Sequence, residues 1–175
     1  FPPSGINWDD SGFAVTDFSK PGRKYLAITT AGRSAKFTLR GVSSSLLQSV
    51  YACYDDLEKW DPYSTLLVYF NSLRELGGAV VLMQDDVHDA IDDICRYRKE
   101  NKRKIENVEE LTSRLSQEEV LELLHKFEIK ANQDECLDVV LATNMVSVGV
   151  DISRLGLMVV LGQPKGRSEY IQATS

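Results

Sequence analysis

The sequence predicts an α/β domain built on a parallel sheet with helices on both faces. The first observation is a series of short, uninterrupted apolar runs, of which Val139–Ala142 and Leu157–Leu161 are the clearest. Runs this short, closed by glycine, proline or small polar residues, are typical of strands that are buried on both faces of a parallel sheet. The second observation is that stretches with helical spacing of apolar residues lie between these runs. Alternating strands and helices favour parallel pairing within a single domain.

The length and composition fit one soluble domain. The chain has 175 residues, of which 43% are hydrophobic and 26% are charged, and its net charge is −6. This length allows one domain with a proper core. We expect a linker or loop over residues 1–20, which contain prolines and glycines without periodicity, and one folded domain over residues 21–175. No apolar run approaches the roughly 20 residues that a membrane span needs, so no membrane contact is expected.

The cysteines and histidines give no pattern typical of a metal site. Cys53, Cys95 and Cys136 are far apart and odd in number, and no Cys-x-x-Cys pair or histidine cluster accompanies them. Neither zinc nor a disulfide framework is therefore indicated. We expect reduced thiols in or near the core of a cytoplasmic protein. His88 and His125 lack a partner at a catalytic or ligand spacing, so both are interpreted as surface or boundary residues.

Two strands are expected in the first half of the chain. Tyr25–Thr30 is rich in strand-forming residues and follows a turn-like Pro-Gly pair. Thr65–Phe70 is a mostly apolar run, and helical character follows it through Leu73 and Leu76. These segments predict the first strands of the sheet.

A helix is expected between these two strands. Apolar residues recur at helical spacing from Leu46 to Leu57. A serine cluster at residues 43–45 precedes them and would cap the start of the helix, because serine side chains accept hydrogen bonds from free N–H groups there. Asp61-Pro62 would end the helix, since the residue before a proline avoids the helical region.

Residues 85–104 predict a helix with acids at its start and bases at its end. Its apolar stripe runs from Val87 to Cys95, with five aspartates early and six lysines and arginines late. This order complements the helix dipole. The aspartates alternate with core positions, which favours a solvated face over a metal or acid–base site. The basic run from Arg96 to Lys104 is the best electrostatic candidate for a nucleic-acid backbone contact, and a charged helix end is the alternative.

The next strand and helix are expected over residues 108–127. Val108–Leu111 is a weak strand that leads into Thr112-Ser113-Arg114. Ser116 and Glu119 then have the spacing of a capping box. The apolar face of the following helix is formed by Val120, Leu123, Leu124 and Phe127.

The chain from Ala142 to Ser175 carries the most specific pattern. It places small polar residues, glycine and one acid after the first strand, and a proline, a tyrosine and a glutamine after the second. In chain order these are Thr143, Asn144, Gly149, Asp151, Pro164, Tyr170 and Gln172. In parallel sheets ligands bind just beyond the carboxyl ends of the strands, where such residues fall. The pattern resembles motif V and the opening of motif VI of superfamily-two helicases and translocases, with the greatest resemblance to the helicase subunit of DISARM-type anti-phage systems.

The resemblance implies a RecA-like domain, the C-terminal one of the two in such a nucleic-acid motor. Residues 69–77 resemble motif IV of the family, and the strand, turn and helix over residues 108–127 resemble motif IVa. The chain would end within motif VI, whose two arginines would follow Ser175, so we expect a piece of a longer protein. Its implied partners are an N-terminal RecA-like domain of the same protein and a DNA or RNA strand.

The resemblance also implies half of an ATP site. Gly149, Asp151 and Gln172 would bind ATP, with Asp151 accepting a hydrogen bond from the ribose. The sequence lacks the phosphate loop G-x-x-x-x-G-K-[ST] and an acidic metal-binding tetrad. ATP and Mg²⁺ would therefore be held mainly by the partner domain. We expect no catalytic residue and no metal ligand in this chain, and no ATP hydrolysis by the chain alone.

The implied nucleic-acid contacts lie at strand ends, and each has a plainer interpretation. The six residues are Asn71, Ser72, Thr112, Arg114, Thr143 and Asn144. Asn71 and Ser72 could instead cap a helix, Arg114 could pair with a carboxylate, and Thr143 could merely end its strand. Asp151 could likewise cap a turn.

Two other functions remain open on the sequence alone. The net charge of −6 argues mildly against a nucleic-acid binder, because such proteins usually have a basic surface. A non-catalytic RecA-like scaffold that binds protein partners within a larger complex is the main alternative. An unrelated doubly wound enzyme is weaker, since no nucleophile–base pair, metal cluster or glycine-rich dinucleotide loop supports it.

Overall fold

The structure of the chain is a computed structural model. It describes residue 19, residues 22–143, residue 152, residues 154–166, residues 169–170 and residue 173. The chain divides into two units, Phe1–Ala31 and Gly32–Ser175. The described residues of the first unit form neither helix nor strand.

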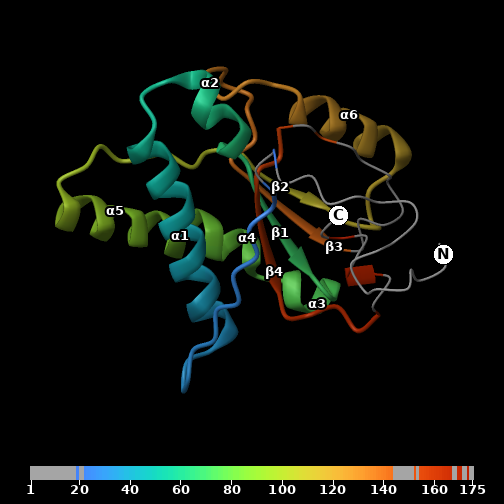
Figure 1. Ribbon diagram of the computed structural model, residues 1–175. Helices are drawn as coiled ribbons and strands as arrows, with labels where there is room; N and C mark the ends of the chain where they lie inside the picture. Colours follow the sequence, from blue (N-terminus) through green and yellow to red (C-terminus); the bar gives the residue numbers. More distant parts are fainter. Residues whose placement is uncertain are drawn as a thin grey trace. The chain divides into compact units, whose positions relative to one another are not determined.

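Helices and strands alternate through the second unit (Figure 1). In chain order the elements are α1 (Ala35–Cys53), α2 (Leu57–Trp60), the 3₁₀ turn η1 (Asp61–Tyr63), β1 (Leu66–Phe70), α3 (Leu73–Leu76), α4 (Ala79–Val81), the π-helical turn η2 (Leu82–Asp86), α5 (Val87–Arg98), β2 (Val108–Leu111), α6 (Gln117–Phe127), β3 (Val139–Thr143) and β4 (Leu157–Leu161). The expected strands at Thr65–Phe70, Val108–Leu111, Val139–Ala142 and Leu157–Leu161 are confirmed to within one residue.

The four strands form one parallel sheet in the order β2-β3-β1-β4. Phe70 at the end of β1 is level with Thr143 of β3 and with Leu161 of β4. Leu111 at the end of β2 is level with Ala142. All four carboxyl ends therefore lie at one edge of the sheet, which we call the carboxyl edge.

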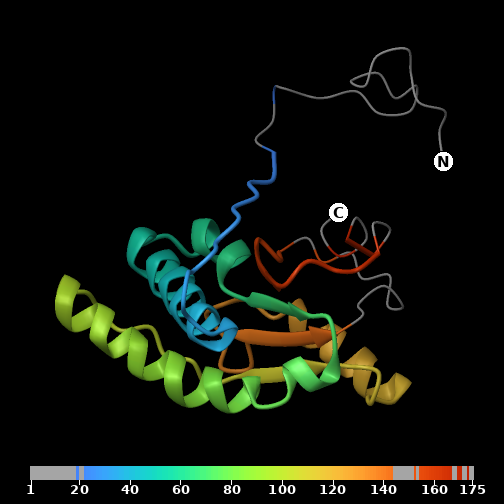
Figure 2. The same ribbon diagram turned by 90° about the horizontal axis from the view of Figure 1, so that it is seen from below.

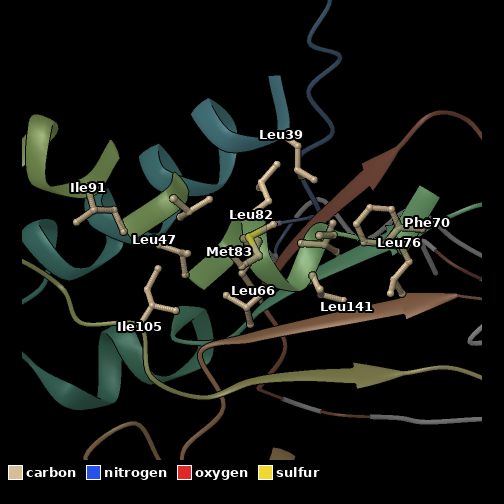
Figure 3. Close-up of a cluster of buried hydrophobic side chains, with 14 of the residues drawn as sticks. Leu39, Leu47, Leu66, Phe70, Leu76, Leu82, Met83, Ile91, Ile105 and Leu141 are labelled. Atoms are coloured by element: carbon tan, nitrogen blue, oxygen red, sulfur yellow. The ribbon is translucent and has the colours of Figure 1, made fainter. Parts of the chain in front are cut away.

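Apolar side chains cover both faces of the sheet. Alternate residues of β1, including Leu66 and Phe70, join residues of α1 and α5 such as Leu47 and Ile91 in one buried cluster (Figure 3). Leu67 of β1 belongs to a second cluster that contains residues of β3 and α6. Because successive strand residues point to opposite faces, α1 and α5 cover one face and α6 covers the other (Figure 2). The predicted α/β class, a RecA-like parallel sheet with helices on both faces, is confirmed.

The capping box at the start of α6 is also confirmed. Ser116 Oγ accepts from Glu119 N at 3.3 Å, and Glu119 Oε2 accepts from Ser116 N at 2.7 Å. The hydrogen bond from the Ser116 backbone holds the pKa of Glu119 below its ordinary value. Two N–H groups that the helix itself leaves unpaired are thereby satisfied.

Replacing Ser116 by alanine is expected to lower the free energy of unfolding by about 1 kcal/mol, because the first turn of α6 loses its cap. Denaturant titration of the chain measures the change. Ser113→Ala is the matched control, since Ser113 is exposed and precedes the helix. Equal stability of the two variants would contradict the assigned role of the cap.

The expected start and end of the first helix are wrong. α1 begins at Ala35, where Ser34 Oγ accepts from Phe37 N at 3.2 Å, and it ends at Cys53. The serine cluster lies inside the helix, with Ser43 and Ser44 buried, so these residues do not cap it. Both side chains are packed within the fold, and α1 is in contact with α5. Ser43 and Ser44 are therefore packing residues within α1, and they do not cap it.

The expected strand at Tyr25–Thr30 is wrong as well. Residues 25–30 have neither strand nor helical structure. Strand propensity describes how a side chain fits a pleated surface, and it supplies no hydrogen-bonding partner. No described strand pairs with this segment.

The three cysteines carry free thiols, of which Cys95 and Cys136 are buried and Cys53 is exposed. Burial raises the pKa of the Cys95 thiol. Among the described residues, no helix is both long and apolar enough to cross a membrane.

Candidate functional site

The carboxyl edge of the sheet brings together residues from three neighbouring strands. Thr143 is the last residue of β3, Thr112 directly follows β2, and Asn71 directly follows β1. The register places Thr112 level with Thr143 and Asn71 one position beyond them. Sequence positions as far apart as 71 and 143 thus meet at the edge where α/β sheets bind ligands.

The two threonines at this edge are almost fully buried. Thr112 is 6% exposed and Thr143 is 8% exposed. Thr112 Oγ1 accepts from Arg114 N at 3.4 Å, which closes the turn after β2. Such hydroxyls, placed on fixed strand ends, can donate to a phosphate without a large loss of side-chain freedom.

Asn71 and Ser72 both have internal partners. Ser72 Oγ accepts from Glu75 N at 3.3 Å and caps α3, as the plainer interpretation predicts. Asn71 Nδ2 donates to Leu161 O and to Gly162 O, each at 3.1 Å. Gly162 has φ +78°, and a side chain there would begin 3.2 Å from Asn71 Nδ2. Asn71 therefore fixes the turn that leaves β4.

The amide oxygen of Asn71 differs from its nitrogen. Oδ1 is buried and has no hydrogen-bond partner among the described residues. An amide oxygen accepts hydrogen bonds and does not donate them. Oδ1 can therefore accept a hydrogen bond from a hydroxyl or an N–H group. A phosphate contact through Nδ2 would instead compete with the hydrogen bonds that Nδ2 donates to the turn after β4.

Arg114 extends from the turn after β2 and is exposed. Within the described part of the chain it forms no ion pair, so the alternative of a carboxylate partner is not observed. Its position next to Thr112 leaves the guanidinium available to an anion at the carboxyl edge.

The basic run from Arg96 to Lys104 does not lie at the carboxyl edge. Two of its residues, Lys102 and Arg103, form ion pairs within the fold. Lys102 Nζ lies 2.6 Å from Asp92 Oδ1, and this contact holds the pKa of Asp92 below its ordinary value. Arg103 is 4% exposed and donates to Asp138 Oδ1 at 3.1 Å and to Ser64 O. Ser64 and Asp138 precede β1 and β3, at the amino-terminal edge of the sheet. Arg103 is therefore a buried part of the fold and is not available to a nucleic-acid backbone.

Four expected site residues lie outside the described residues: Asn144, Gly149, Asp151 and Gln172. The chain is described on both sides of the first three, at Thr143 and again at Ile152 and Arg154. Ile152 packs against the cluster beneath α6. Arg154 is held by several hydrogen bonds.

Arg154 ties three segments together at the amino-terminal edge. Its Nη2 and Nε donate to the two carboxylate oxygens of Asp61 at 2.6 and 3.0 Å. Its Nη1 donates to Phe127 O at 2.7 Å and to Ile129 O. Burial favours a higher pKa of Asp61, but the hydrogen bonds from Arg154 and Ala131 N outweigh it, so this pKa lies below its ordinary value.

A second contact secures the same segment. Gly156 N donates to Pro62 O at 2.7 Å. A side-chain carbon on Gly156 would lie 2.6 Å from the Tyr63 ring and 2.7 Å from Pro62 O, closer than such carbons approach other atoms. Glycine is thus required for the close approach of these two backbones.

Comparison with known proteins identifies the family. Residues 62–175 match the helicase conserved C-terminal domain. The chain belongs to this helicase family. The matched range includes all four strands of the sheet and the whole carboxyl edge.

The whole chain, as well as the matched helicase domain, is similar to one further protein. It is 45% identical over 183 residues to the DISARM protein DrmA of Bacillus paralicheniformis (strain ATCC 9945a / NCIMB 11709 / CD-2). The alignment covers 100% of this chain and 16% of that relative. The chain thus corresponds to about one sixth of the length of this relative.

Two residue pairs of the helicase domain were not predicted from the sequence. Asp61 and Arg154 are 93 positions apart, and Tyr69 and Glu169 are 100 positions apart. Asp61 was expected only to end a helix, and Glu169 was given no role. No local pattern marks either pair, because each is created by the order of strands in the sheet.

Proposed function

We propose that this chain is the C-terminal RecA-like domain of an ATP-dependent helicase or translocase. It supplies half of an ATP site between two domains and part of the nucleic-acid path. The observation that carries the proposal is the convergence of Asn71, Thr112 and Thr143 at the carboxyl edge, in a domain of the helicase family.

The nucleic-acid path follows from the chemistry of this edge. Thr112, Thr143 and Arg114 offer hydroxyl and guanidinium donors, which suit phosphate oxygens. Contacts to phosphates position a strand without reading its bases, as a motor that moves along any sequence requires. Ser72 and Asn144 extend the same path, and the track is DNA or RNA.

The ATP half-site involves the loop after β3 and the chain after β4. Asp151 accepts a hydrogen bond from the ribose, Gly149 permits the tight path of the backbone, and Gln172 orients groups near the cleft. The described residues contain no group of acids, histidines or cysteines that could hold a metal ion. An N-terminal RecA-like domain of the same protein is the main holder of ATP and Mg²⁺, and ATP hydrolysis supplies the free energy for movement.

The wider setting is proposed from the relative. The DISARM protein DrmA is about six times as long as the region it shares with this chain, which leaves room for the partner domain. We assign residues 21–175 to the RecA-like domain and residues 1–20 to the linker that precedes it. The longer protein would act in the cytoplasm, in a DISARM-type anti-phage system.

Replacing Thr143 by valine in the longer protein is expected to weaken binding of single-stranded nucleic acid about tenfold, because one hydrogen bond to a charged phosphate is lost. The loss should be similar for strands of different sequence. Fluorescence anisotropy at several salt concentrations measures both the affinity and its salt dependence.

Thr65→Val is the matched control. It removes a buried hydroxyl that donates to Leu137 O at 2.7 Å at the opposite edge of the same sheet. This variant should lose stability and keep its affinity for nucleic acid. Salt-independent or absent binding by the unaltered longer protein would instead favour a scaffold that binds protein partners, for which the net charge of −6 is the supporting observation.

A further inference from the structure

Strand β1 holds the chain that leaves β4 at two points. The first is Asn71, which donates to the turn at Leu161 and Gly162. The second is Tyr69, whose hydroxyl donates to Glu169 Oε1 at 2.7 Å. Both side chains come from the carboxyl end of the same central strand, so two separate contacts fix the path from β4 toward the end of the chain.

Tyr69 is placed rigidly. The residue has no exposed surface, and the register sets it level with Ala142 of β3 and Val160 of β4. It stands two residues after Leu67 and so points to the face that α6 covers. A buried tyrosine hydroxyl requires a polar partner, and a carboxylate gives a short, charge-assisted hydrogen bond.

Glu169 is a residue of a helical turn. Tyr170 N donates to Gly166 O at 3.0 Å, and residues 169, 170 and 173 are helical. The Tyr69 contact therefore acts on a residue whose neighbour, Tyr170, forms a helical backbone hydrogen bond. Gln172, an expected ATP-binding residue, comes three positions after Glu169.

We propose that Tyr69 is a positioning residue, whose hydroxyl fixes the helical turn at Glu169 relative to the carboxyl edge of the sheet. The inference rests on the proposed function, because the turn leads into the ATP half-site. Loss of the hydroxyl displaces this turn and lowers the rate of ATP hydrolysis, since small misplacements of aligned groups slow a reaction strongly. Nucleic-acid affinity is retained, because Thr112 and Thr143 are positioned by β2 and β3.

The test uses the longer protein and four variants. Tyr69→Phe keeps the buried ring and removes only the hydroxyl, and Glu169→Ala removes the acceptor. Both should lower kcat for nucleic-acid-stimulated ATP hydrolysis about tenfold, with an unchanged Kd for the strand. Glu169→Gln keeps an acceptor oxygen and should restore most of the rate. Tyr54→Phe is the control, because Tyr54 lies after α1 and forms a ring contact with Tyr63.

Amide hydrogen exchange of residues 163–173 gives a measurement that does not depend on ATP. Tyr69→Phe should speed exchange in this segment about tenfold, and Tyr54→Phe should leave it unchanged. Equal exchange in the unaltered and Tyr69→Phe proteins, or equal kcat for Tyr69→Phe and Tyr54→Phe, would overturn the proposal. If the unaltered longer protein hydrolyses no ATP, the proposed function fails, and the exchange comparison alone decides the role of Tyr69.

Discussion

Replacing Arg154 by methionine is expected to lower the free energy of unfolding by about 3 kcal/mol. The side chains of Arg154 and Asp61 are only 14% and 16% exposed, so the variant leaves a largely buried carboxylate without its cation. The carbonyl groups of Phe127 and Ile129 lose a donor in the same step. Urea unfolding of the chain, followed by circular dichroism, measures the loss.

A second change separates the unpaired charge from the lost contacts. Asp61→Asn removes the charge and keeps an oxygen that can accept from Ala131 N. The double variant Arg154→Met/Asp61→Asn should therefore be more stable than Arg154→Met alone, by about 1 kcal/mol or more. If Arg154→Met has the stability of the unaltered chain, Arg154 does not anchor the segment before β4.

Replacing Arg103 by methionine should also cost about 3 kcal/mol. Arg103 is almost fully buried between Ser64 O and Asp138, and its guanidinium lies 5.9 Å from the centre of the Trp60 ring. Asp138 Oδ2 also accepts from the backbone N–H groups of Glu106 and Asn107, so loss of the arginine disturbs the approach to β2. Denaturant titration should show the change in midpoint.

Arg98→Met is the control for this prediction, because Arg98 is exposed at the end of α5. Its stability should stay within about 0.5 kcal/mol of the unaltered chain. The folded fraction of Arg103→Met should bind nucleic acid as the unaltered protein does. A stable Arg103→Met variant with weakened binding would restore the interpretation of this run as a backbone contact.

The sheet was predictable because its central strands have a simple sequence pattern. β1 and β3 are buried on both faces, so they appear as unbroken apolar runs that end in small polar residues. The capping box of α6 is equally local, since its two residues are three positions apart. Both of these local patterns were confirmed.

Features that depend on partners distant in the sequence were not predictable. Tyr25–Thr30 has the composition of a strand and no described partner. The serines at 43–45 resemble a cap, yet they lie inside α1, where Ser43 and Ser44 are buried. In the sequence Arg103 resembles a surface cation, whereas in the folded domain it forms an ion pair with Asp138.

The candidate site divides in the same way. Asn71, Thr112 and Thr143 were implied by the family resemblance, and the register brings them to one edge. Their roles toward nucleic acid stay predictions, as do those of Gly149, Asp151 and Gln172. The pairs Asp61–Arg154 and Tyr69–Glu169, which hold the segments around these residues, emerged only from the three-dimensional arrangement.

The most direct measurement is ATP hydrolysis by the longer protein, with and without single-stranded nucleic acid, for the unaltered sequence and for Asp151→Ala. The account predicts hydrolysis that rises with nucleic acid, and a KM for ATP about tenfold higher in Asp151→Ala, because one hydrogen bond to the ribose is lost. Asp85→Ala, on an exposed turn before α5, should match the unaltered protein. A rate of hydrolysis that does not change with nucleic acid would contradict the assignment of this domain as half of an ATP site. The same holds if the KM for ATP of Asp151→Ala equals that of the unaltered protein.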